Sequence, residues 1–354
     1  MRPVDTRRYA RQLTLREIGA DGQRKLAEAS VVVIGAGGLG SPVLHHLVAS
    51  GVGTVGIVEF DTVDISNLHR QTLYSTFDVG GDKLAASTER LQAVNPDVRI
   101  VPHAIKLTSA TAVDVLSGYD LVVDGSDNFA TRYVVNDAAV GKGVPIVYAS
   151  VNQFSGQASL LGVPGGPCYR CLFPEPPPAG LIPSCEDGGV LGVVPSILGT
   201  IQATEALKWI LQIGAPLVGR LLLVDALAME FREVQFGRDP MCPTCGDHRR
   251  PTEVTETPEV TVRELRRRLE GPSPPALIDV READERRPGD LDGESIPLPT
   301  LDIREPELEA FRGRDVVVYC AAGGRSAQAV RFLRERGYKA ESLRGGMAAW
   351  HASA

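Results

Sequence analysis

The sequence predicts an α/β protein: a Rossmann-like doubly wound sheet, parallel with an antiparallel extension, followed by a small second α/β domain. Three observations support this fold class. Apolar strand-like runs alternate with helical runs from Val31 to about Ser150, as in sheets whose parallel strands are joined by helices. A glycine-rich turn, Gly35–Gly40, directly follows the first apolar run, where such sheets bind phosphate groups. The length of 354 residues is enough for about two domains.

The expected elements of the first domain follow the period of their apolar residues. A charged, amphipathic helical segment covers residues 5–28. Antiparallel strands at 154–163 and 220–236 extend the sheet, with a long helix at 190–213 between them. The parallel part has expected strands at 31–34, 55–60, 98–102, 119–124 and 144–149, and expected helices at 39–50, 82–94, 109–117 and 128–142.

A second compact domain is expected after a linker. Residues 247–258 are polar, rich in Thr, Glu and Pro, and without periodicity, which is typical of a linker. The linker separates a first domain at 1–246 from a second at 259–354. The second domain is expected to contain a helix at 262–269, strands at 276–280 and 315–319, and a helix at 326–336.

Composition restricts the classes of partner. The chain has 37 Lys and Arg residues against 44 Asp and Glu residues, a net charge of -7, and no basic tract that could follow a nucleic-acid backbone. It has no secretory apolar segment near Met1 and no apolar run near the roughly 18 residues that a membrane span requires. We therefore expect a cytoplasmic protein that binds neither nucleic acid nor membrane.

The glycine-rich turn is expected to bind a nucleotide. The glycines bring bare backbone N–H groups near an anion, and the helix that follows points its positive end at the same place. A close-packed strand–helix turn without a ligand is the alternative. Glu59 and Asp61 end the second strand, about twenty residues past the turn, where an acidic side chain commonly binds a ribose. NAD and ATP both satisfy this pattern.

Charged side chains at other strand ends favour Mg-ATP over a nicotinamide cofactor. Arg70 and Lys83 would place two cations at the open edge of the site. A triphosphate requires such cations because negative charge builds up on its oxygens and on leaving pyrophosphate during attack at phosphorus. Asp127 follows the fourth strand and could hold Mg²⁺, which prefers one or two carboxylates together with substrate phosphates.

Five segments of the first domain resemble the ubiquitin-activating-enzyme-like superfamily, and in particular its MoeB/ThiF branch. The resemblance implies adenylation of the C-terminal glycine of a ubiquitin-like sulfur-carrier protein by a homodimer, with Arg11 reaching the neighbouring subunit's ATP. Glu59 departs from the aspartate that is usual at the ribose position. The segments are Arg8–Gln12, Gly35–Gly40, Asp64–Gln71, Gly81–Lys83 and Asp124–Asn128, and the implied ATP-binding residues are Gly38, Glu59, Ser66, Asn67, Leu68, His69, Arg70, Lys83, Asp127 and Asn128.

Four of the six cysteines form two C-x-x-C pairs, Cys168 with Cys171 and Cys242 with Cys245. This spacing is typical of four thiolates that close a tetrahedral zinc site. A site with no open coordination position has a structural role. Disulfides or a redox C-x-x-C are the alternatives, and a reducing compartment disfavours both.

The other two cysteines are candidate sulfur-handling residues. Cys185 lies in a stretch punctuated by Pro and Gly, and the MoeB/ThiF resemblance aligns it with a cysteine that bonds to the activated carrier in some relatives. A passive role for Cys185 stays open. Cys320 follows a buried strand and precedes a helix, so backbone N–H groups and Arg325 are expected to favour its thiolate.

Three segments from residue 259 on resemble a rhodanese domain, which implies a persulfide on Cys320. They are Leu277–Arg281, Cys320–Ser326 and Leu343–Trp350. Together with the first domain, this predicts an enzyme that adenylates a carrier ending in Gly-Gly and delivers sulfur to it. The catalytic candidates are Arg11, Arg70, Lys83, Asp127, Cys185, Cys320 and Arg325.

Two other functions and several substrates stay open from sequence alone. The chain could be an NAD-dependent oxidoreductase with a rhodanese appendage, or a non-catalytic scaffold for sulfur relay. The sulfur could come from a cysteine desulfurase or from thiosulfate. The carrier could serve molybdopterin, thiamine, cysteine or tRNA thiolation.

Overall fold

The computed structural model describes residues 5–176, 189–247, 258–282, 285–301, 303–321 and 323–352. The chain divides into two compact units, the first formed by the described residues up to 247 and the second by those from 258 on. Within these ranges, every helix is too short or too polar to cross a membrane.

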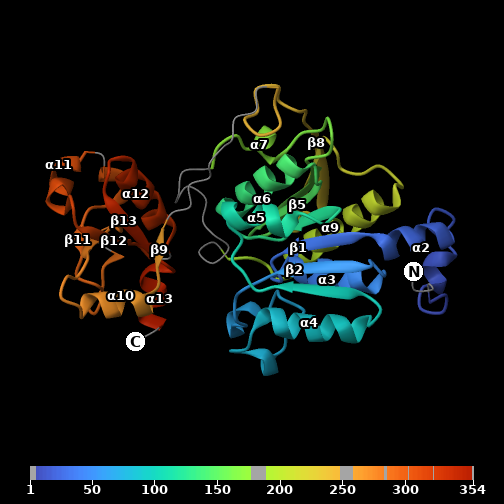
Figure 1. Ribbon diagram of the computed structural model, residues 1–354, viewed down its shortest axis with the longest axis horizontal. Coiled ribbons are helices and arrows are strands. Elements are labelled where there is room, and N and C mark those ends of the chain that lie inside the picture. The colour runs from blue at the N-terminus through green and yellow to red at the C-terminus, as the bar shows by residue number, and fades with distance from the viewer. Residues whose placement is uncertain are drawn as a thin grey trace. The chain divides into compact units, whose positions relative to one another are not determined.

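One mixed sheet of eight strands, in the order β3-β2-β1-β4-β5-β6-β7-β8, forms the centre of the first unit (Figure 1). The strands from β3 to β5 pair in parallel, and those from β5 to β8 pair antiparallel. This confirms the expected doubly wound sheet with its antiparallel extension. The strands are β1 (Ser30–Ile34), β2 (Thr54–Val58), β3 (Arg99–His103), β4 (Leu121–Asp124), β5 (Ile146–Asn152), β6 (Ser155–Leu161), β7 (Arg220–Asp225) and β8 (Glu230–Gln235).

Helices cover both faces of this sheet because its central strands are apolar on both sides. In β1, Val31 and Val33 pack into one core cluster, whereas Val32 and Ile34 pack into the other. Alternate residues of a strand point to opposite faces, so a continuous apolar run requires a cover on each. Helices α3 (Gly40–Ala49) and α4 (Lys83–Val94) lie on the first face, and α5 (Ser109–Leu116) and α6 (Phe129–Lys142) lie on the second (Figure 1).

Two further helical segments pack against this sheet and its helices. The N-terminal segment forms α1 (Ala10–Leu13) and α2 (Gly19–Glu28), and buried Tyr9 accepts a hydrogen bond of 2.7 Å from Asn95. The long helix α9 (Val193–Leu211) packs against α3 and β5. Its buried Gln202 donates to the carbonyl oxygens of Asp124 and Val147, at 2.7 and 3.0 Å. These bonds tie α9 to the strand ends at which the site lies.

The second unit is a parallel sheet of five strands in the order β11-β10-β12-β13-β9. In β12, Val316 and Val318 enter one core cluster, and Val317 and Tyr319 enter the other. The expected helices and strands are present, and β9, β11, α11, β13 and α13 are additional elements. The elements are β9 (Glu259–Val260), α10 (Val262–Leu269), β10 (Ala276–Asp279), β11 (Glu294–Ser295), α11 (Glu305–Leu308), β12 (Asp315–Tyr319), α12 (Gly324–Glu335), β13 (Lys339–Leu343) and α13 (Gly346–Ala352).

Candidate functional site

The glycine-rich turn joins β1 to α3 at the point where the order of the strands reverses. β1 pairs with β2 on one side and with β4 on the other, and ligands bind at such switch points beyond the carboxyl ends of the strands. Gly35 has a φ of +86°, which side chains disfavour. A Cβ atom on Gly40 would lie 1.9 Å from the Gly35 carbonyl oxygen. The turn therefore closes only with glycine at these two positions.

A second polar turn follows β4 at the same edge of the sheet. The buried Asp124 carboxylate accepts hydrogen bonds from the Ser126 N–H and hydroxyl groups, at 3.0 and 2.6 Å. Asn128 caps α6 by accepting from the Thr131 N–H at 2.9 Å. Asp127 stands between these anchored residues and is exposed. Its neighbours thus hold the turn while its carboxylate stays available for a ligand.

These two turns and the start of α9 surround one cavity. Four of the residues expected to bind nucleotide line it: Gly38, Arg70, Asp127 and Asn128. A Cβ atom on Gly38 would lie 3.1 Å from Pro195 and 3.5 Å from Arg70, so any side chain there would reduce the space. The cavity therefore combines a bare backbone turn, a cation and a carboxylate, as a metal-bound nucleotide requires.

Glu59, the expected ribose ligand, is buried and bound to the glycine-rich turn. One carboxylate oxygen accepts from the Ala36 N–H at 2.9 Å. The other accepts from the N–H groups of Phe60 and Asp61, at 2.8 and 3.0 Å. The longer side chain at this position therefore stabilises the turn. Its contact with a ribose stays a prediction.

Lys83 is buried at the start of α4, with its ammonium nitrogen 3.7 Å from the Asp61 carboxylate. Burial raises the pKa of Asp61, and the charge of Lys83 opposes that shift. The negative charges of Glu59 and Asp127 also act on Asp61. Lys83 thus belongs to the same group of charges as Asp127, although it lies outside the lining of the cavity as described.

The other residues expected to bind the nucleotide, Ser66 to His69, directly precede Arg70 in the sequence. The backbone of Ser66 accepts a hydrogen bond from Arg70 at 3.1 Å, and His69 contacts the same guanidinium nitrogen at 2.9 Å. The Asn67 amide donates to the Ser66 hydroxyl at 3.4 Å, while Leu68 packs against the core. The contacts with Ser66 and His69 orient Arg70, and nucleotide binding by the four neighbours stays a prediction.

Sequence reasoning did not single out two buried polar residues in the cavity wall, Gln71 and Arg132. Among the described residues, Gln71 Oε1 and Arg132 Nε have no hydrogen-bond partner, which suits a wall that receives a polar ligand. Arg132 also donates to the Ser126 carbonyl oxygen at 3.2 Å. Arg132 lies four residues after Asn128, the residue that caps α6, so both lie on the same side of the start of this helix, a spacing that could have identified Arg132.

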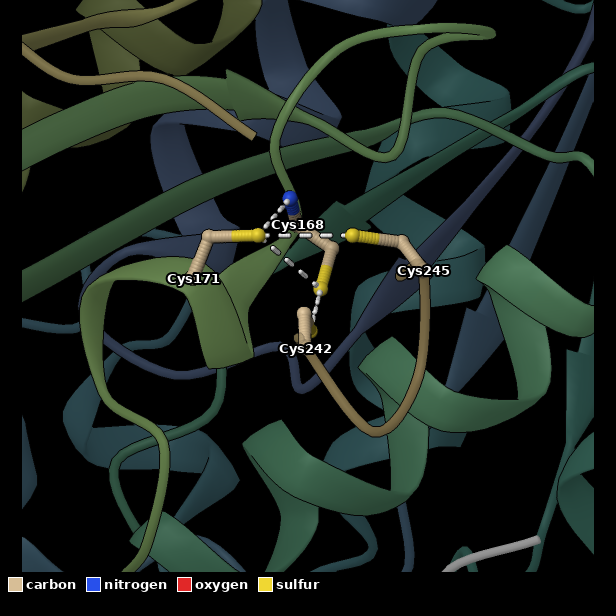
Figure 2. A group of neighbouring side chains, drawn as sticks. All are labelled: Cys168, Cys171, Cys242 and Cys245. Carbon is tan, nitrogen blue, oxygen red and sulfur yellow. Dashed lines mark hydrogen bonds between the residues drawn. The ribbon is translucent and has the colours of Figure 1, made fainter. Parts of the chain in front are cut away.

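The four cysteines of the C-x-x-C pairs come together, as their spacing indicates (Figure 2). All four sulfur atoms lie within 4.8 Å of one another. Sulfur–sulfur distances are 3.5 Å for Cys168–Cys242, 3.3 Å for Cys171–Cys245 and 4.0 Å for Cys168–Cys171. For Zn–S bonds of about 2.3 Å, the edge of a tetrahedron is about 3.8 Å. The described residues therefore form a four-cysteine metal site.

Electrostatics and a shared carboxylate support the metal site. A hydrogen bond with Cys168 lowers the pKa of Cys171 to about 5, and the same bond together with burial raises the pKa of Cys168. Each thiolate opposes the next, so a bound cation is needed to ionise all four. Asp137 on α6 links the two C-x-x-C segments. It accepts a hydrogen bond of 2.8 Å from Arg170 in the first segment and one of 2.8 Å from the Thr244 hydroxyl in the second.

In the second unit, Cys320 lies between β12 and α12, as expected, and is buried. Its sulfur accepts from the Gly323 N–H at 3.1 Å and lies 3.5 Å from the Ser326 hydroxyl. Gly323 has a φ of +102° at the start of the helix. The backbone turn and the helix N-terminus thus provide donors to a thiolate or persulfide.

Arg325, which the sequence predicts to be a cation near Cys320, forms an ion pair in the structure. Its guanidinium forms two hydrogen bonds with the Glu285 carboxylate, both of 2.5 Å. The cation next to the thiol therefore has a partner from another segment, which only the tertiary structure brings near. Cys185, the other candidate thiol, lies outside the described residues.

Comparison with known proteins assigns both units. Residues 9–244 match the ThiF family, and residues 261–353 match the rhodanese-like domain. The sulfur carrier protein adenylyltransferase of Thermus thermophilus is 54% identical over 70% of this chain and 94% of its own. The adenylyltransferase and sulfurtransferase MOCS3 of Sus scrofa is 40% identical over 98% of this chain and 85% of its own.

A solved structure shares the fold of the first unit. The crystal structure of E. coli MccB with ATP superposes with a TM-score of 0.61, covering 69% of this chain and 75% of that one, at 24% identity. This similarity supports the fold alone. With a family match over 236 residues, from 9 to 244, and relatives that extend across both units, the chain belongs to the ThiF family and carries a C-terminal rhodanese-like domain.

Proposed function

We propose that this protein is an adenylyltransferase and sulfurtransferase that acts on a ubiquitin-like sulfur-carrier protein ending in Gly-Gly. It adenylates the C-terminal glycine carboxylate of the carrier and then converts it to a thiocarboxylate. The observation that carries the proposal is the presence, in one chain, of a cavity lined by the glycine-rich turn, Arg70 and Asp127, and of a thiol in a rhodanese-like domain. The name of the MOCS3 relative states both activities, and the name of the Thermus thermophilus relative states the first, with a sulfur carrier protein as its substrate.

The first step joins the carrier carboxylate to the α-phosphorus of ATP and releases pyrophosphate. Arg70 and Lys83 stabilise the negative charge that develops on the phosphoryl oxygens and on the leaving group. Mg²⁺ held by Asp127 would supply further positive charge to the phosphates. Buried Arg132 helps to position the Asp127 carboxylate, because it donates to the Ser126 carbonyl oxygen in the turn that carries Asp127.

The second step uses a persulfide on Cys320. Its outer sulfur attacks the acyl carbon of the adenylate, the carbon–oxygen bond breaks, and AMP leaves. The product is an acyl disulfide between carrier and enzyme. A thiolate, which we assign to Cys185, then cleaves the sulfur–sulfur bond, so that the thiocarboxylate leaves and a Cys185–Cys320 disulfide forms. An external dithiol reduces that disulfide.

The metal of the four-cysteine site is assigned as zinc with a structural role. Four thiolates at tetrahedral distances suit zinc or an iron–sulfur cluster, and the single-ion spacing of the sulfur atoms favours zinc. All four ligands come from the protein. The site therefore joins two distant segments and leaves no open position for a substrate.

We also propose a homodimer in which Arg11 completes the neighbouring subunit's ATP site. Arg11 is exposed near the end of α1 and is available for such a contact. The test mixes two inactive variants, Arg11→Ala and Lys83→Ala. A mixed dimer contains one site with both residues, so pyrophosphate exchange returns on mixing. An Arg11→Ala variant that keeps full exchange by itself contradicts this role.

The overall function is tested by separating its two steps. Cys320→Ala leaves carrier-dependent ATP–pyrophosphate exchange intact and abolishes the oxygen-to-sulfur mass change of the carrier, whereas Asp127→Ala abolishes exchange. Loss of exchange in folded Cys320→Ala contradicts the division of labour. Carrier binding without exchange in the unmodified protein indicates a scaffold. Thermal protection by NAD rather than Mg-ATP indicates an oxidoreductase.

A further inference from the structure

We infer that Glu285 determines the sulfur donor: by pairing with Arg325 it selects an organic persulfide, R–S–SH, and disfavours thiosulfate. This inference rests on the proposed sulfurtransferase function and names its donor class. The carboxylate comes from the segment after β10, and the guanidinium comes from the first turn of α12, five residues after Cys320.

The ion pair occupies the terminal nitrogens of the Arg325 guanidinium, which would otherwise be available to bind an anion. Both terminal nitrogens of Arg325 bind the two oxygens of Glu285, each at 2.5 Å. This two-fold geometry is the one by which a guanidinium binds a planar or tetrahedral oxyanion. The hydrogen bond with Arg325 holds the pKa of Glu285 below its usual range, so the carboxylate is charged at neutral pH.

The pair lies at a partly buried position, where solvent screens part of the attraction between its charges. Its two side chains are 27% and 32% exposed, and exposed ion pairs contribute at most about 1 kcal/mol. Another arginine of this unit, Arg281, is buried and pairs instead with Asp279 and Asp290, both at 2.8 Å. The Glu285–Arg325 pair lies close enough to Cys320 for a charge on that thiol to act on Arg325.

Charge at the thiol then distinguishes the donors. With Cys320 as thiolate, the three groups carry a net charge of minus one, which repels the thiosulfate dianion. Without the carboxylate the sum is zero, and the guanidinium is free to bind the sulfonate oxygens. An organic persulfide carries its sulfane sulfur on a thiol and needs no oxyanion site.

The transfer balances without an added oxidant or reductant. The Cys320 thiolate attacks the outer sulfur of R–S–SH, and a new sulfur–sulfur bond forms. The donor's sulfur–sulfur bond breaks, its electron pair leaves with RS⁻, and the proton stays on the transferred sulfur. With thiosulfate, the same attack would release sulfite.

The test measures sulfur transfer to cyanide by the full-length protein, with thiosulfate or cysteine persulfide as donor. Glu285→Gln lowers the KM for thiosulfate about tenfold. A tenfold change in affinity lies between the free-energy contribution of an exposed ion pair and that of a hydrogen bond to a charged group. Its KM for cysteine persulfide and its kcat change less than about twofold, since one charged contact is gained only with the oxyanion. Glu285→Asp gives a smaller gain with thiosulfate.

Two controls isolate the ion pair. Glu309→Gln removes an equal charge from the same unit, where Glu309 pairs with Arg312 at 2.8 Å, and leaves both KM values unchanged. Arg325→Gln added to Glu285→Gln removes the gain with thiosulfate. An unchanged thiosulfate KM in folded Glu285→Gln, or an equal change for both donors, overturns the inference. If neither donor loads Cys320 in the unmodified protein, the proposed sulfurtransferase function itself fails.

Discussion

Replacing Cys242 by serine removes one thiolate from the four-cysteine site and is expected to release the metal. The consequence for stability follows from what the site joins. Cys168 and Cys242 are 74 residues apart in the sequence, yet their sulfur atoms lie 3.5 Å apart. A metal bound to both pairs therefore cross-links a long loop, and its loss lets the unfolded chain expand.

The magnitude can be worked from the length of that loop. The chain-entropy expression for cross-links gives about 4.5 kcal/mol at 25 °C for a loop of about 75 residues. A change of 1 kcal/mol shifts Tm by about 2–4 °C for a unit of this size, so the first unit is expected to unfold about 9–18 °C lower. Chelation of the metal in the unmodified protein should produce a fall of the same size.

The assay combines metal content with thermal unfolding. The unmodified protein is expected to contain one zinc ion per chain, and Cys242→Ser none. The control is Cys320→Ser, which changes a cysteine of the second unit and should leave both zinc content and Tm of the first unit unchanged. Zinc retained in Cys242→Ser, or zinc lost with a Tm shift below about 2 °C, would refute the cross-link reasoning.

Three further outcomes are expected. Gly40→Ala should abolish thermal protection by Mg-ATP because its Cβ would lie 1.9 Å from a carbonyl oxygen, whereas Gly141→Ala, with open space in α6, keeps protection and gains up to about 1 kcal/mol. Lys83→Ala should reduce pyrophosphate exchange by about 10²–10³, and a normal rate excludes it from the mechanism. Arg132→Leu should cost about 3–5 kcal/mol in urea unfolding because it leaves Asp124 without its nearby cation. Burial raises the pKa of Asp124 and the charge of Arg132 opposes that rise, so the loss grows as Asp124 ionises with rising pH, and an equal loss at acidic and at alkaline pH would contradict this reasoning.

The sequence alone determined the elements and most of the chemistry. The expected strands and helices between Val31 and Ser150 are present because each is set by a local period of apolar residues and a nearby turn. The glycine-rich turn could be predicted for the same reason. Spacing of two residues within each C-x-x-C pair likewise indicated a metal site before the pairs were known to meet.

Residues that depend on contacts between distant segments could not be predicted in this way. β9 and β11 contain two residues each and exist only because they pair with β13 and β10. Glu59 was expected to face a ribose, but its nearest donors are N–H groups of the turn that the fold places beside it. These features depend on tertiary pairing, which no local window of sequence contains.

The balance of charge at the two reactive centres was decided in the same way. The sequence predicts a cation, Arg325, near Cys320, and the fold brings Glu285, 40 residues away in the sequence, to neutralise it. Arg132 reads as one more helical arginine, and the fold buries it behind the turn that carries Asp127. Local pattern thus specifies which groups are present, whereas long-range packing specifies which charges they meet, because electrostatic energy depends on distance in space and on burial.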